Sequence, residues 1–156
     1  MAWADPTTIV YNQLLDVATL NQYMVDNPLA LKNPPTDLDQ NWNTTINTTS
    51  TSFVDITGAD VTITTTGGRI MIGFHTPHTA SGGVTTYFTI TIDGVEVSGH
   101  ANGVALVTSG GTSQMSFVYL TAALAAGAHT VKIQWRVDSG ARTATINKFQ
   151  LWAREA

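Results

Sequence analysis

Residues 84–97 read VTTYFTITIDGVEV, and this stretch decides the fold class. Apolar and polar positions alternate along it with a period of two, so that Phe88, Ile90 and Ile92 fall on one face of an extended strand. The Asp93-Gly94 pair that follows predicts a tight hairpin turn, because both central positions of such a turn need a positive φ angle. The stretch therefore predicts a half-buried strand that turns back on itself within an antiparallel sheet.

Similar alternation continues on both sides of this stretch, from residue 53 to the end of the chain. Short apolar-polar segments recur at intervals of about ten residues with few helical patterns between them, which is typical of a β-sandwich or jelly roll. Thr57-Gly58-Ala59 predicts a break between the first two strands, and three glycine pairs predict hairpin turns: Gly67-Gly68, Gly82-Gly83 and Gly110-Gly111. We therefore expect residues 53–156 to form a mainly β, jelly-roll-like antiparallel sandwich of about eight or nine strands.

The first 52 residues follow other patterns. Residues 1–15 show no sustained period and predict an extended arm. Asp16 can cap a short α-helix, whose apolar stripe holds Leu20 and Met24. Residues 36–52 are polar and rich in Asn, Asp and Thr, which predicts a linker or surface loop. The predicted organisation is an N-terminal arm and short helix over residues 1–35, a polar linker over residues 36–52 and the sandwich over residues 53–156.

Composition narrows the possible partners. Charged residues make up 12% of the chain, about half the usual share, and the formal net charge is −4. The seven Lys and Arg residues form no basic cluster, so nucleic acid is not an expected partner. The absence of cysteine excludes disulfides, thiolate catalysis and Cys-based zinc sites. We also expect no membrane span and no signal peptide, because no apolar run is long enough to cross a bilayer and the start of the chain lacks both a basic and an apolar segment.

Catalytic constellations are not visible in the sequence. The chain has only two glutamates, Glu96 and Glu155, and no nucleophile elbow, metalloprotease pair or phosphate loop. His75 and His78 are weak candidates for metal ligands, with His100 or His129 as a third ligand, although the proline between the pair splays the segment. We therefore expect no enzyme activity, no catalytic residue, no metal site and no cofactor.

Two groups of residues are candidates for binding. The first comprises large apolar side chains of the predicted arm and helix, which have little local structure to bury them and which either fold back or dock on another subunit: Trp3, Ile9, Val10, Tyr11, Leu14, Leu20 and Met24. The second comprises Tyr87, Trp135 and Trp152, which could form an aromatic platform for a glycan on one sheet face. Aromatics at alternating strand positions are, however, more often core or subunit-interface residues.

Several short motifs resemble segments of tailed-bacteriophage and prophage virion proteins. In those proteins a Trp-Thr-x-Pro-like start leads into a short helix, and a β-rich module follows. The chain departs from the pattern at Val25, where an arginine is usual, and at Pro28, where the helix usually continues. The matching motifs are Trp3-x-x-Pro6, Ala18-Thr19-Leu20-Asn21, Val25-Asp26-Asn27, Ala30-Leu31-Lys32, Ile92-Asp93-Gly94-Val95 and the stretch AGAHTVKIQW at residues 126–135.

This resemblance implies a non-enzymatic structural protein on the virion surface, assembled in the host bacterial cytoplasm. The length suits a capsid decoration (cement) protein, which docks on the head lattice through its arm and is often a trimer. The expected partners are therefore other virion subunits, either the major capsid protein or a tail protein, together with further copies of the chain. The alternative is a tail-fibre, receptor-binding or carbohydrate-binding β module.

Overall fold

A computed structural model describes residues 35–41 and 44–156, and all regular elements in these ranges are β-strands. Of the predicted arm and short helix over residues 1–35, residues 1–34 lie outside the described residues. Thr36–Ala156 forms one compact unit. The mainly β fold class predicted from the alternating pattern is therefore confirmed for the described part of the chain.

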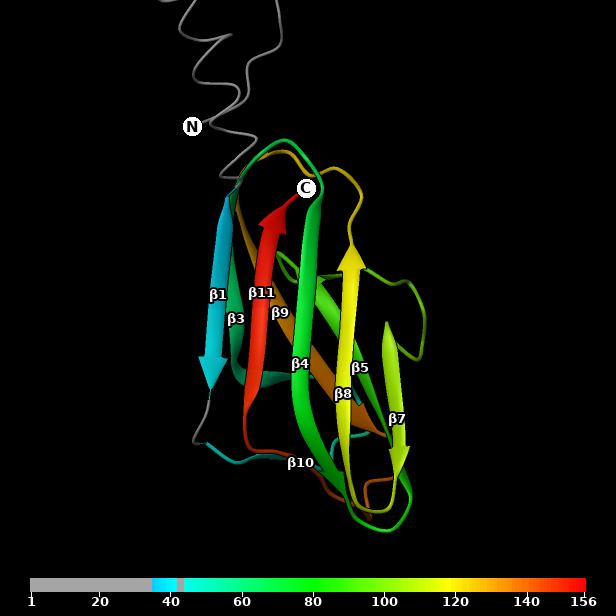
Figure 1. Ribbon diagram of the computed structural model, residues 1–156. Helices are drawn as coiled ribbons and strands as arrows, with labels where there is room; N and C mark the ends of the chain where they lie inside the picture. Colours follow the sequence, from blue (N-terminus) through cyan, green and yellow to red (C-terminus); the bar gives the residue numbers. More distant parts are fainter. Residues whose placement is uncertain (1–34, 42–43) are drawn as a thin grey trace, which may run out of the picture. The chain divides into compact units, whose positions relative to one another are not determined.

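Two antiparallel sheets pack face to face (Figure 1). Sheet A contains β1 (Thr36–Asn41), β2 (Ile46–Thr48), β4 (Ile70–Ala80), β8 (Thr112–Leu120), β10 (Ala144–Ile146) and β11 (Phe149–Glu155). Sheet B contains β3 (Val54–Thr66), β5 (Val84–Ile92), β6 (Val95–Glu96), β7 (Ala105–Ser109) and β9 (Ala126–Val137).

The pairing is that of a jelly roll. β1 and β2 lie along the same edge of β11 and β10, so each of these two pairs acts as one interrupted strand. β6 and β7 share one edge of β5 in the same way. Each sheet then has four strands across, in the orders β1/β2–β10/β11–β4–β8 and β3–β9–β5–β6/β7. This arrangement is an eight-stranded, double-sheet jelly roll.

The predicted linker over residues 36–52 is wrong for residues 36–41 and 46–48, which form β1 and β2. β1 pairs with β11 along its whole length, from Thr36 opposite Arg154 to Asn41 opposite Phe149. An edge strand pairs with a neighbour on one side and meets solvent on the other. Polar side chains are therefore compatible with it. Asp37 contributes further, because its Oδ2 accepts a hydrogen bond of 2.9 Å from the backbone N–H of Thr62 in sheet B.

Two further expectations about strand ends are corrected. Thr57-Gly58-Ala59 does not end a strand: β3 continues through it, and its register with β9 shifts between Asp55 and Asp60 as in a β-bulge. The three glycine pairs are not hairpin turns, because each leads from one sheet to the other, for example from β7 to β8 at Gly110-Gly111. Glycine permits the reversal but does not determine which sheet the next strand joins.

The hairpin predicted at Asp93-Gly94 is confirmed. Asp93 and Gly94 have φ angles of +51° and +81°, and β5 continues directly into its partner β6. Beyond this turn, the Asp93 carboxylate accepts one hydrogen bond, of 2.8 Å, from the backbone N–H of Thr130 and pairs with His129 at 2.7 Å. The turn is therefore tied to β9 as well as to its own hairpin.

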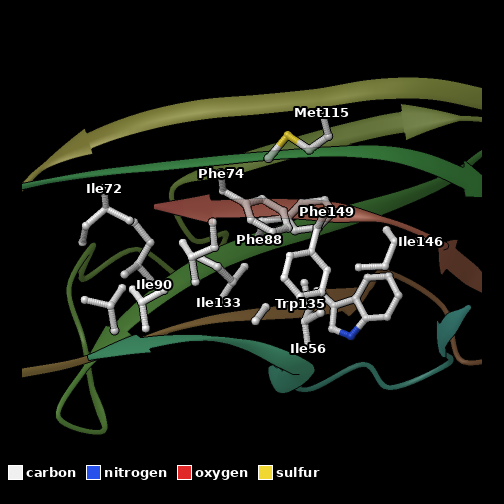
Figure 2. Close-up of a cluster of buried hydrophobic side chains, with 14 of the residues drawn as sticks. Ile56, Ile72, Phe74, Phe88, Ile90, Met115, Ile133, Trp135, Ile146 and Phe149 are labelled. Atoms are coloured by element: carbon white, nitrogen blue, oxygen red, sulfur yellow. The ribbon is translucent and has the colours of Figure 1, made fainter. Parts of the chain in front are cut away.

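An aromatic and aliphatic core fills the space between the sheets (Figure 2). Phe74 of sheet A lies at its centre, with ring centroids 6.1 Å from Phe88, 6.0 Å from Phe149 and 5.7 Å from Phe117. The largest fully buried side chains are Ile56, Ile63, Ile70, Ile72, Phe74, Phe88, Ile90, Ile133, Trp135, Ile146, Phe149 and Leu151. They come from both sheets and alternate with outward side chains, so the faces that remain for binding are the two outer ones.

Candidate functional site

The predicted attachment residues lie outside the described residues. These are Trp3, Ile9, Val10, Tyr11, Leu14, Leu20 and Met24. Their role in docking therefore stays a prediction from the sequence, and the sites described below are all on the sandwich.

The three candidate aromatics do not form one platform. Trp135 is only 1% exposed and packs in the core, with its ring centroid 6.3 Å from that of Phe88. Tyr87 is half-buried at an outward position of sheet B, opposite Arg136, and Trp152 is half-buried at an outward position of sheet A. Strand parity places the three rings on three different surfaces, so they cannot form the platform that the sequence left open, and Trp135 has the core role that is more usual for such aromatics.

Sheet A carries an apolar outer face around Trp152. One row across the sheet reads Leu38, Trp152, Gly73 and Val118 on β1, β11, β4 and β8, which lie side by side in Figure 1. The indole lies over Gly73, where a Cβ atom would come within 2.2 Å of the ring. Leu38 and Val118 are 51% and 63% exposed. The neighbouring row reads Thr36, Arg154, Met71 and Leu120, so it adds two apolar side chains beside an exposed arginine. We call Leu38, Met71, Val118, Leu120 and Trp152 plus Gly73 the apolar face of sheet A.

Such a face is a candidate contact surface. Single exposed apolar side chains are ordinary, but a contiguous group on a flat sheet is typical of an interface with another molecule. β8 also forms one side of sheet A and contains neither a charged residue nor a proline, the usual devices that discourage pairing with another strand.

His75 and His78 do not converge on a metal. Both lie on β4, but His75 is exposed on the outer face while His78 is fully buried against the core. Residues three apart on a strand point to opposite faces, which explains the separation. No group of three or more potential metal ligands occurs in residues 35–41 and 44–156.

His78 is a buried, uncharged histidine. Its Nε2 atom is 2.8 Å from the hydroxyl of Thr86, while Nδ1 is buried without a hydrogen-bond partner in the described part of the chain. Burial lowers the pKa of His78 below its ordinary value of 6.5. The imidazole is therefore a core residue that also carries a titratable group.

Because the unfolded chain binds a proton at His78 more readily than the folded chain, stability should fall as the pH drops below about 6.5. For one proton, the free energy of unfolding changes by at most about 1.4 kcal/mol per pH unit. Hydrogen bonds to the carbonyl of Ala125 and to Asp93 raise the pKa of His129. Its contribution to the free energy of unfolding therefore changes above pH 6.5 and leaves the range below it to His78. Urea unfolding of the native chain and H78Q between pH 5 and 7 checks this: the slope should be lost in H78Q. Equal slopes would contradict it.

The outer face of sheet B holds a shallow hollow that sequence patterns do not indicate. Its volume is about 540 Å³, and it lies between the loop after β6, the segment before β3 and the outward side of β9. Its lining combines an aromatic ring, hydroxyls, an imidazole and two opposite charges, from Thr51, Ser52, Phe53, Glu96, Gly99, His100, Ala101 and Arg136. Alternation along β9 and β5 could have placed Arg136 and Tyr87 on the same outer face. The lining residues that come from loops follow no periodic pattern, so the sequence gives no signal for them.

Arg136 is fixed in place at the edge of this hollow. Its guanidinium carbon lies 4.0 Å from the ring centroid of Tyr87 and 5.2 Å from that of Phe53. Its Nη2 group donates hydrogen bonds to the carbonyl of Ala101 at 3.1 Å and to Oδ1 of Asn102 at 3.3 Å. Stacking on two rings and bonding to the loop hold the cation rigidly at the protein surface.

Comparisons with known proteins show the fold and no more. No protein-family model matches the sequence, and no curated protein matches it. The structure of infectious bursal disease virus, Gx strain, is similar with a TM-score of 0.55 and 16% sequence identity, over 78% of this chain and 32% of the viral chain. The chain therefore spans about a third of the viral chain, with which it shares a β-sandwich fold.

Two looser likenesses carry no argument. One is to the CBM36-1 domain of a multidomain xylanase from the hindgut metagenome of Trinervitermes trinervoides, with a TM-score of 0.38 and 11% identity over 74% of this chain and 95% of that chain. The other is to Eiger TNF from S. frugiperda, with a TM-score of 0.39 and 10% identity over 78% and 94% of the two chains.

No helix in the described ranges is long and apolar enough to cross a membrane.

Proposed function

We propose that the chain is a non-enzymatic structural protein of a tailed-phage particle, in which it decorates the capsid. The predicted N-terminal arm docks on the head lattice, and the jelly roll stands on the virion surface. Further copies of the chain and the major capsid protein are the partners, and a homotrimer is the assembly that the sequence resemblance implies.

The apolar face of sheet A is the observation that carries this proposal. It exposes Leu38 and Val118 by more than half, beside the half-buried Trp152, and brings them together with Met71 and Leu120, whereas the exposed Val54, Val95 and Leu106 lie on three different strands of sheet B. Leaving these groups in water is unfavourable by about 25 cal/mol for each Å² of apolar surface, so an assembled state that covers them is favoured. The virion-protein motifs and the fold shared with part of a viral structure agree with a particle as that assembly.

Immunogold electron microscopy tests the proposal. Antibody raised against the recombinant chain is applied to particles from the source culture, with pre-immune serum as the control. We expect gold spread evenly over the heads. Gold confined to tail tips would favour the alternative, a tail-fibre or receptor-binding subunit, and particles without gold would contradict both roles.

A further inference from the structure

We propose that the hollow on the outer face of sheet B binds a neutral saccharide unit of a glycan. Arg136 and Glu96 line this hollow without pairing to each other, beside the ring of Phe53 and the hydroxyls of Thr51 and Ser52. This inference goes beyond the structural role, because it concerns a different face from the apolar one, and it assigns glycan binding to residues other than the predicted aromatic platform.

Arg136 supplies permanent hydrogen-bond donors. The ion pairs in the described residues are His129 with Asp93 and Lys132 with Asp55, so no carboxylate of residues 35–41 or 44–156 neutralises Arg136. A guanidinium has five N–H donors in a planar fork, and the two bonds to the loop both start from Nη2. The remaining donors are available to a ligand in a geometry that the two aromatic rings fix.

Glu96 supplies a permanent acceptor. Burial alone would raise its pKa, but hydrogen bonds from Ser98, Thr89 and Gly99 outweigh burial and lower the pKa to about 2. Oε1 accepts bonds from the hydroxyl of Thr89 and from both the backbone N–H and the hydroxyl of Ser98. Oε2 accepts one bond, of 2.8 Å, from the backbone N–H of Gly99, and so retains capacity for a ligand hydroxyl.

The loop between these charges is pre-organised. Backbone bonds from Val97 to Ile90 at 3.1 Å and from Val104 to Phe88 at 2.8 Å fix its two ends to β5. Gly103 adopts a φ angle of +71° and lies so close to β5 that a Cβ atom would come within 2.2 Å of the Phe88 carbonyl oxygen. A hollow that is already ordered loses little conformational entropy when a ligand enters.

The pair of unjoined charges selects the ligand chemistry. A carboxylate or phosphate in the hollow would face the Glu96 carboxylate, and an ammonium group would face Arg136. A sugar hydroxyl can accept from the guanidinium and donate to the carboxylate, so a neutral polyol suits both. The Phe53 ring adds apolar surface for sugar C–H groups, and the hollow is shallow and open to solvent, with a volume of about 540 Å³.

Titration of the full-length, ¹⁵N-labelled chain tests the site. The probes are the methyl glycosides of glucose, galactose, mannose and N-acetylglucosamine, followed by ¹H–¹⁵N correlation spectra. With at least one probe we expect saturable shifts of the amides of Ser52, Gly99 and His100 and of the Arg136 Nε–H signal. A single sugar ring on an open surface should bind with a Kd of about 1–10 mM.

Matched variants locate the binding. R136M should weaken it about tenfold or more, since a hydrogen bond from a charged group is lost. R154M makes the same change on exposed Arg154 of sheet A and should leave the Kd unchanged. Because Arg136 also holds the loop, H100A serves as a second variant at an exposed lining residue and should weaken binding without altering the fold.

Three results would overturn the proposal. The first is the absence of saturable shifts with all four glycosides at about 100 mM, a concentration at which a Kd of about 10 mM would still register. The second is a set of shifts centred on Trp152, or shifts that both R136M and H100A leave unaltered. The third is tighter binding of methyl glucuronide or inorganic phosphate to the same amides, which would make the hollow an anion site.

Discussion

Replacement of Trp135 by alanine should lower the free energy of unfolding by about 3–5 kcal/mol. The indole is 1% exposed and contacts the aromatic cluster through Phe88, so the change both removes the free energy gained by burying the indole and leaves a cavity. Figure 2 shows it beside Ile56, Phe149 and Ile146, which come from both sheets. Since single domains are stable by only about 5–15 kcal/mol, a large part of the total stability would be lost.

Trp152 provides the matched control. W152A removes the same side chain from the outer face of sheet A, where the ring is half-buried over Gly73 and leaves no enclosed cavity. Guanidinium chloride unfolding followed by far-ultraviolet circular dichroism should therefore show a much smaller decrease for W152A than for W135A. If W135A does not fold, W135F keeps a ring in the site and should give an intermediate value. Equal losses for W135A and W152A would contradict the assignment of Trp135 to the core.

Much of the sandwich could be predicted because its strands obey one simple rule. A period of two separates inward from outward positions, and Phe88, Ile90 and Ile92 do share the inward face of β5. The predicted half-buried strand is wrong for the second half of β5, where the outward Thr89 and Thr91 are buried as well. The turn at Asp93-Gly94 was equally predictable, since few residue pairs tolerate two successive positive φ angles. Local chemistry determines both features, so the sequence alone suffices for them.

Features that depend on distant partners could not be predicted. β1 and β2 are strands because β11 and β10 offer them free edges, and nothing in their own polar sequence indicates those partners. The glycine pairs indicate reversals, but the choice between a hairpin and a crossing to the other sheet depends on where apolar faces are buried. The same limit applies to His75 and His78, which are close in sequence. Both lie on β4, and a spacing of three residues on one strand places them on opposite faces of the sheet.

The candidate sites divide in the same way. Trp135, Tyr87 and Trp152 are candidates from the sequence, but the surface that each ring faces depends on strand parity in three different strands, and Phe53 of the hollow has no signal in the sequence. The hollow at Arg136 needed the loop after β6 to fold back over sheet B, and hydrogen bonds to Glu96 fix that loop. Sequence patterns report periodic elements well, whereas a binding surface built from loops becomes visible only in three dimensions.

Deletion of residues 1–15 should abolish binding to particles while the sandwich stays folded. The arm carries Trp3, Ile9, Val10, Tyr11 and Leu14, and each large side chain buried on a neighbouring subunit would contribute on the order of 1.5–3 kcal/mol. The sandwich begins at Thr36 and retains all of its strand pairs, so it should stay folded, which far-ultraviolet circular dichroism checks. Co-sedimentation with particles that lack the protein measures binding. As a control, replacement of those five side chains by serine in the full-length chain should give the same loss of binding. A truncated chain that binds as well as the native one would contradict the prediction and place attachment on the sandwich. The apolar face of sheet A would then be the surface to alter next.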